Sequence, residues 1–231
     1  MSTVSVRREF GAGPLARAVA LVYALLVVEV LLVVTTLPGL VPLLLLDRDA
    51  SNLPLAAACL LPVGPAVSAA LFAVHRHHGD LTDLHPGRAF WRGYRLNVAG
   101  VLRIWVPALV WLTIIAMTVT HLPAAGVPRW WTVPLVVVAV AVALWTANAI
   151  VISSLFAFRA RDVARLAGYF LTRSPGGTLR TACLLVVAAA VTALTSDAVL
   201  ALLGSVLVLL WLRASGAMIR TTREEFTQDP A

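Results

Sequence analysis

Apolar runs too long for the core of a small soluble protein constrain this chain more than any other feature. Residues 16–46 are apolar for about thirty positions, interrupted by little more than Arg17 and Glu29. A helix needs about 20 predominantly apolar residues to cross a bilayer. Further runs follow, and the chain is 60% hydrophobic but only 13% charged, about half the charged fraction of a soluble domain. The sequence therefore predicts an integral membrane protein.

Prolines, glycines and polar turns divide this apolar sequence into six predicted spans. A basic lead at 1–15 and a polar tail at 221–231 flank a membrane domain at 16–220, with spans at about 16–37, 53–74, 98–121, 132–158, 178–194 and 198–220. The first span is expected to end before Pro38, because proline disfavours helix at the preceding residue. Pro62, Gly64 and Pro65 are expected to kink the second span. The predicted fold class is all-α, a polytopic membrane helix bundle.

The positions of the arginines predict how the spans are oriented. All 18 basic residues are arginine, and 16 of them fall in the lead or directly after it at Arg17, in two long loops at 75–103 and 159–180, and from Arg213 onward. The opposite side carries only Arg48 and Arg129. Because positive residues accumulate in cytoplasmic loops, both termini are predicted to be cytoplasmic. Orientation also accounts for the net charge of +7, so no nucleic-acid partner is expected, only the lipid bilayer and a protein partner.

The first long loop is predicted to contain an amphipathic helix. Pro86 suits the first turn of a helix. At 100° per residue, the arginines after it gather on one side and the aromatic residues on another, so we expect an interfacial helix that runs into the third span. This face is a candidate surface for a cytoplasmic partner or for anionic lipid head groups. Alternatively, it is an anchor that only sets topology. The residues concerned are Arg88, Phe90, Trp91, Arg92, Tyr94 and Arg95.

The second long loop repeats the pattern of the first. Leu-Phe-Ala at 71–73 recurs at 155–157, and Gly-Val-Leu-Arg at 100–103 is matched by Gly-Thr-Leu-Arg at 177–180. The repeated unit is a span, a basic aromatic loop and another span, used twice in the same orientation. A second amphipathic cytoplasmic helix is therefore predicted in the second loop.

These motifs resemble a known family. The sequence LPVGPAVSAALF at 61–72, RAFWRGYRLN at 88–97 and LTRSP at 171–175 resemble the YesL-like family of bacterial membrane proteins, over roughly 22–218 of this chain. The resemblance implies a six-span, multi-pass protein of the bacterial inner membrane, of unknown biochemical function. It also implies an accessory part in carbohydrate uptake by ABC transporters, and it offers no catalytic residues.

Two polar residues lie inside predicted spans. Glu29 is the only acid deep in a span, and an intramembrane carboxylate is expensive to bury, which makes a proton or cation relay one hypothesis. The alternative is a hydrogen bond between helices, with Thr, Ser or Asn148 as the partner. Glu29 and Asn148 are thus the candidate intramembrane polar site.

Histidines in the first loop are weak candidates for metal binding. His75, His77, His78 and His85, with Asp80 and Asp83, supply suitable ligand types. Their spacing matches no established framework, and a polar loop at a membrane surface collects such residues, so neither a metal nor another cofactor is expected. No catalytic residue is predicted either, because the chain has no His-Glu-x-x-His motif and no recognisable Ser–His–Asp set.

Three functional hypotheses follow. The first is a non-enzymatic accessory or regulatory protein that associates with a solute transporter through its basic loops. The alternative is a small transporter or channel that uses the kinked first and second spans around Glu29. The third is a membrane enzyme with a His/Asp loop. A polar pocket at Glu29 and the kink would favour transport, whereas a packing role for Glu29 would favour the accessory hypothesis.

Overall fold

The structure, a computed structural model, describes residues 14–47, 49–79, 85–194 and 203–226, and every regular element among them is a helix. The predicted all-α class is confirmed for these residues. The elements are α1 (Pro14–Leu45), η1 (Ala50–Asn52), α2 (Leu53–Cys59), α3 (Val63–Gly79), α4 (Pro86–His121), η2 (Arg129–Trp131), α5 (Thr132–Leu155), α6 (Ala160–Arg173), α7 (Pro175–Leu194), α9 (Gly204–Ala214) and α10 (Gly216–Phe226).

The first helix passes through two prolines without ending. The predicted end at residue 37 is wrong, because α1 continues to Leu45 with Pro38 and Pro42 inside it. Gly39 lies at this point, and its missing side chain lets the α1 backbone meet the Cys59 carbonyl at the end of α2. A proline within a membrane helix is tolerated where a neighbouring helix packs against the disturbed turn. Close packing on α2 therefore outweighs the local preference of the prolines.

The predicted kink in the second span is present. α2 ends at Cys59, α3 begins at Val63, and their directions differ by 40°. At this break the Leu60 carbonyl accepts a hydrogen bond from the indole Nε1–H of Trp105 in α4, at 2.9 Å. Gly64 makes room for the indole ring, because a Cβ on Gly64 would stand 2.6 Å from Trp105 Cγ. The bend is thereby fixed to α4.

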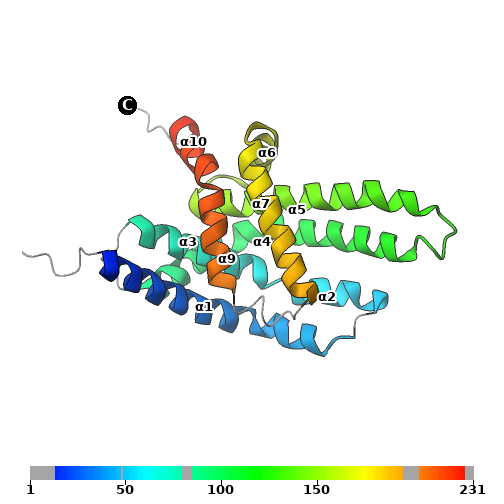
Figure 1. The fold of residues 1–231 in the computed structure, drawn as a ribbon, viewed down its shortest axis with the longest axis horizontal. Helices are drawn as coiled ribbons and strands as arrows, with labels where there is room; N and C mark the ends of the chain where they lie inside the picture. Colours follow the sequence, from blue (N-terminus) through cyan, green and yellow to red (C-terminus); the bar gives the residue numbers. More distant parts are fainter. Residues whose placement is uncertain (1–13, 48, 80–84, 195–202, 227–231) are drawn as a thin grey trace, which may run out of the picture.

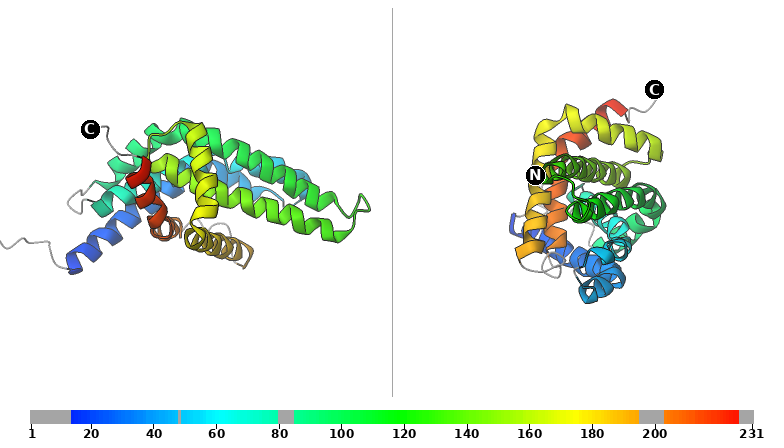
Figure 2. Two further views of the ribbon diagram at one scale, coloured as in Figure 1. Left: turned by 90° about the horizontal axis from the view of Figure 1, so that it is seen from above. Right: turned by 90° about the vertical axis from the view of Figure 1, so that its right-hand side faces the viewer.

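α4 and α5 form a long hairpin that reaches beyond the other helices (Figures 1 and 2). At its base, Asn97 Nδ2 of α4 donates to the Ser154 carbonyl of α5 at 3.1 Å. Apolar side chains cover the protruding part, and those of Trp111 and Val137 are 60% and 61% exposed. An exposed apolar surface of this extent is typical of a region that contacts lipid tails.

Small side chains bring α3 against its neighbours. Ala66, Ala69 and Ala70 are fully buried, and small residues at membrane helix interfaces allow the backbones to approach closely. On the same helix, Ser68 Oγ accepts a hydrogen bond from the Ser154 hydroxyl of α5 at 2.8 Å. The core of the described protein is therefore centred on α3, with α1, α4, α5 and α9 around it.

A sharp corner separates α6 from α7. The two helices meet at 100°, and Ser174 between them has φ −121° and ψ 66°, which is not helical. Proline restricts the residue before it in this way, and Pro175 opens α7. The Thr178 hydroxyl donates to the Leu171 carbonyl across the corner at 3.2 Å. The corner therefore coincides with the Ser-Pro pair, at which a continuous helix is locally disfavoured.

Three of the described helices are long and apolar enough to cross a membrane, at Arg17–Leu45, Pro86–His121 and Arg129–Leu155. The number rises to five if each bent pair, α2 with α3 and α6 with α7, counts as one span. These helices indicate a membrane protein. The structure does not reproduce the predicted sixth span as one helix. α9 has 11 residues, about half the length that a bilayer requires, and residues 195–202 lie outside the described part.

Candidate functional site

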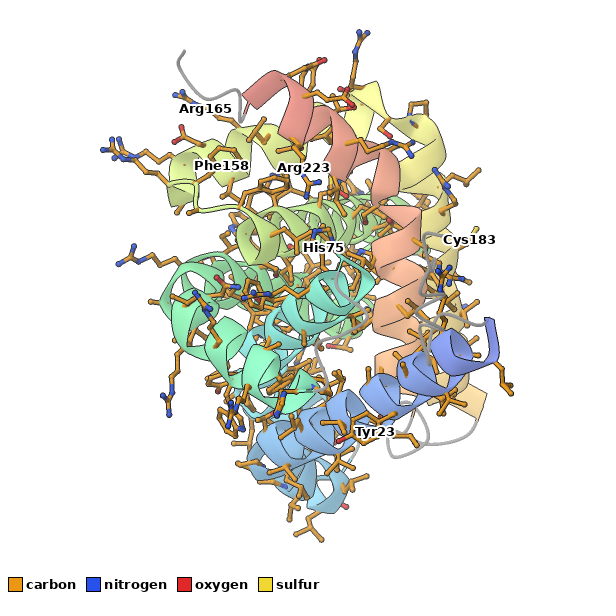
Figure 3. All side chains as sticks on the ribbon, turned by 90° about the vertical axis from the view of Figure 1, so that its left-hand side faces the viewer. Tyr23, His75, Phe158, Arg165, Cys183 and Arg223 are labelled. Carbon is orange, nitrogen blue, oxygen red and sulfur yellow. The ribbon has the colours of Figure 1, made fainter. Side chains whose placement is uncertain are left out.

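Arginine side chains project from several helices, and Arg165 of α6 and Arg223 of α10 are labelled in Figure 3. The hydrogen bond between Asn97 and Ser154 places the start of α4 beside the end of α5, from which α6 follows. Arg223 Nη2 of α10 lies 3.5 Å from His75 Nε2 of α3. The exposed arginines of these segments are Arg76, Arg88, Arg92, Arg95, Arg159, Arg161, Arg165, Arg173, Arg220 and Arg223. Arg129 stands at the opposite end of the hairpin, before α5, whereas Arg48 lies outside the described residues.

The first turns of α4 present an exposed basic face, which we call the basic face and define as Arg88, Arg92 and Arg95. All three side chains are exposed, whereas Phe90 on the other side of the helix is fully buried. Pro86 occupies the first turn, as predicted. Opposite faces of one helix thus separate charge from core.

Aromatic rings brace this segment. Phe90 and Trp91 meet edge to face with centroids 6.1 Å apart, and Trp91 and Tyr94 do so at 5.8 Å. Trp91 remains 44% exposed, so one indole joins the buried rings to the surface beside the basic face. Gly93 lets α4 lie directly on Phe72 of α3, because a Cβ there would stand 2.8 Å from Phe72 Cδ1. The basic face is therefore carried by a rigid helix that is continuous with a candidate span.

The predicted histidine cluster is described only in part. His75 lies on α3 beside Arg223, and His85 is exposed at the start of α4. The side chains of His77 and His78, together with Asp80 and Asp83, fall outside the described residues. Within the described part, no three His, Cys, Asp or Glu side chains come together in a way that could hold a metal ion.

Glu29 binds the amino terminus of α9. Its Oε2 accepts a hydrogen bond from the backbone N–H of Ser205, the second residue of α9, at 2.6 Å. Carboxylates are favoured at this position because the first N–H groups of a helix have no partner within the helix. The buried Oε1 has no hydrogen-bond partner in the described part of the chain. Glu29 thus makes a hydrogen bond between helices, to a backbone amide rather than to Asn148 or a hydroxyl.

Asn148 lies in a separate place, at the corner between α6 and α7. It lines a small cavity of about 10 Å³, which we call the polar chamber, together with Ser174, Thr178, Thr181 and Ser215. A volume of this order holds about one water-sized group. Asn148 and Ser215 are 6% and 4% exposed, so the chamber is a buried polar site. The two predicted intramembrane polar residues therefore do not come together.

A larger cavity of about 440 Å³, which we call the apolar chamber, lies among α1, the α2–α3 bend, α4, α7 and α9. Leu60 and Val63 at the bend contribute to its lining, so the proline kink faces an apolar space. Its volume falls within the range of small-molecule sites, about 300–1,000 Å³. Both chambers were missed in the sequence. The signals that could have revealed them were the small polar Ser215-Gly216 pair near the end of the predicted sixth span and the Thr178–Thr181 pair one turn apart on α7.

Comparisons with protein-family models, with curated proteins and with solved structures found no match to this chain.

Proposed function

We propose that this chain is a non-catalytic accessory or regulatory protein of the membrane that docks an acidic surface of a partner onto the basic face of α4. The observation that carries the proposal is the way in which the helix presents Arg88, Arg92 and Arg95. All three are exposed on a helix whose opposite side is fixed by the fully buried Phe90. A rigid row of guanidinium groups favours paired hydrogen bonds to carboxylates, and charge complementarity steers association.

The environment of Glu29 supports docking over transport. Glu29 is engaged by the Ser205 amide, and the proline bend faces an apolar chamber rather than a polar one. A transport route would need polar groups along a path through the membrane. The resemblance to YesL-like proteins supports a solute transporter, of the carbohydrate ABC class, as the partner. In the same proposal, six spans cross the bacterial inner membrane and both termini are cytoplasmic.

Cross-linking and affinity capture from native membranes test this proposal. The full-length chain is compared with a variant in which Arg88, Arg92 and Arg95 are all changed to Ala. The matched control changes Arg161, Arg165 and Arg173 of α6 to Ala, which removes the same charge from the same end of the molecule. Protease accessibility of the carboxyl terminus verifies that each variant keeps the topology of the wild type.

We expect the wild type and the α6 variant to capture a transporter subunit that the α4 variant loses. Equal loss in both variants would mean that general positive charge, and not the basic face, is responsible. A correctly inserted wild type that captures no transporter component would overturn the accessory function.

A further inference from the structure

Two cavities follow one another along the paired helices α7 and α9. Leu184 and Ala188 of α7 and Leu207 of α9 line the apolar chamber, whereas Thr178 and Ser215 line the polar chamber. Thr181 lines both, so the chambers meet at this residue. An apolar cavity that adjoins a small polar one is complementary to an amphiphile, which has an alkyl chain at one end and a polar group at the other.

Each chamber is bordered by one unpaired polar atom, because Trp211 lines the apolar chamber and Ser215 the polar one. Trp211 Nε1 and Ser215 Oγ are buried and have no hydrogen-bond partner in the described part of the chain. They are four positions apart in the sequence, so they lie one turn apart on one face of the α9–Ser215 segment. Native structures pair nearly all buried polar groups, and each exception calls for an explanation. Since an indole N–H is a donor only, its partner has to be an acceptor.

We propose that α7 and α9 hold a single long-chain amphiphile, with its chain in the apolar chamber and its oxygen-bearing end beside Trp211 and Ser215. The chemistry is that of a long-chain carboxylic acid or ester, supplied by a free fatty acid or by one acyl chain of a phospholipid. Among the described residues, no charged side chain lines the apolar chamber, which suits an alkyl chain. A carboxyl or ester oxygen accepts hydrogen bonds from both the indole N–H and the Ser hydroxyl. This proposal does not rest on docking at the basic face.

Native mass spectrometry of the full-length protein, released from detergent after incubation with a long-chain fatty acid or with phospholipid, tests the site. Ala188→Phe places a ring inside the apolar chamber, in the path of the chain, whereas Ala190→Phe adds the same ring to the exposed side of α7. We expect the wild type and Ala190→Phe to retain one chain and Ala188→Phe to lose it. The mass of the retained molecule tells a fatty acid from a phospholipid. Retention by Ala188→Phe equal to that of the wild type, or no retention by the wild type, would overturn the proposal.

Fluorescence quenching tests the direction in which the chain lies. Fatty acids carry a spin label near either the carboxyl or the methyl end, and the signal of Trp211 is the difference between the wild type and Trp211→Phe. This difference is needed because the chain has 7 tryptophans. We expect the label near the carboxyl end to quench Trp211 more strongly. Equal quenching by both labels would contradict the proposed orientation.

Ser215→Ala provides a test that leaves the shape of the chambers almost unchanged. Loss of one hydrogen bond is expected to weaken fatty-acid binding by about fivefold to tenfold. The unfolding temperature without fatty acid should stay the same or rise, because the variant removes a buried group that lacks a partner. Unchanged affinity in Ser215→Ala would exclude Ser215 as part of the site.

Discussion

The segments that follow α3 and α5 begin alike and end differently. A Gly-Tyr pair, Gly93-Tyr94 in α4 and Gly168-Tyr169 in α6, stands in each. In α4 the helix then runs on unbroken to His121, whereas α6 ends at Arg173 and the chain turns by 100°. Both segments then reach a Gly-x-Leu-Arg motif. Gly100 lies four positions after Leu96 in the first segment, whereas Gly177 lies six positions after Leu171 in the second, and this longer interval contains Ser174 and Pro175. The corner thus coincides with two extra residues and a Ser-Pro pair.

This difference gives the two segments different surroundings. Gly93 is buried and lies against Phe72, whereas a side chain on Gly168 would meet nothing within 4 Å. The corner also shapes the polar chamber, since Phe170, Ser174 and Thr178 all line it. The straight segment therefore carries the basic face, and the bent segment lines the polar chamber.

Truncation of Phe90 in α4 is expected to cause the largest loss of stability. Phe90 is fully buried, and Phe→Ala in a core costs about 3–5 kcal/mol. We expect Phe90→Ala to lower the free energy of unfolding by that amount, measured by reversible denaturation in mixed micelles. The matched control is Trp91→Ala, next in sequence but 44% exposed, which should cost clearly less. Equal losses would mean that Phe90 is not the main anchor of α4.

Substitution of Glu29 is expected to cause the next-largest loss of stability, because Glu29 joins α1 to α9 through one hydrogen bond. Glu29→Leu leaves the Ser205 amide without its carboxylate, and hydrogen bonds to charged groups contribute about 1.5–3 kcal/mol. Glu29→Gln keeps an acceptor oxygen and should lose less stability in the same assay. Solute flux into liposomes should be the same for wild type and Glu29→Gln. A change in flux without a change in stability would favour the transport hypothesis instead.

The tight contact at Gly93 allows a comparison with its counterpart in α6. Gly93→Ala would place a Cβ 2.8 Å from Phe72 Cδ1, and overpacking of this kind costs about 1–3 kcal/mol. Gly168→Ala meets open space within a helix, so the better helix propensity of Ala should stabilise it by up to about 1 kcal/mol. We expect Gly93→Ala to lower the unfolding temperature and Gly168→Ala to raise it. The same sign for both would mean that the two segments are packed alike.

Local chemistry made part of this structure predictable. The bend near Pro62 and the two faces of α4 follow from rules that act within one or two turns, namely proline geometry and helical periodicity. The continuation of α1 through Pro38 depended on a contact with α2, which no local rule contains. The same limit explains why the boundary at residue 37 was wrong.

The candidate sites were predictable to different degrees for the same reason. Arg88, Arg92 and Arg95 share one face because their spacing is helical, so the basic face could be inferred directly. The partner of Glu29 is a backbone amide 176 positions away, and every residue type except proline has such an N–H, so no side-chain pattern identifies it. The chambers arise where α7, α9 and the helices around them leave space unfilled, which depends on tertiary packing.

Replacement of Pro175 should have the smallest effect and gives the most direct test of the corner. Pro175→Ala frees Ser174 from its restriction, and a proline that fits its site contributes about 0.4–1 kcal/mol through the unfolded state. We expect a loss of that size, together with faster hydrogen exchange at residues 174–178. Pro107→Ala in α4 is the contrasting control, because a proline within a helix blocks the hydrogen bond to the carbonyl four residues earlier. Its removal should stabilise the straight segment. If Pro175→Ala leaves exchange at the corner unchanged, the contacts of Thr178 and the α6–α5 packing hold the turn, and the proline only marks it.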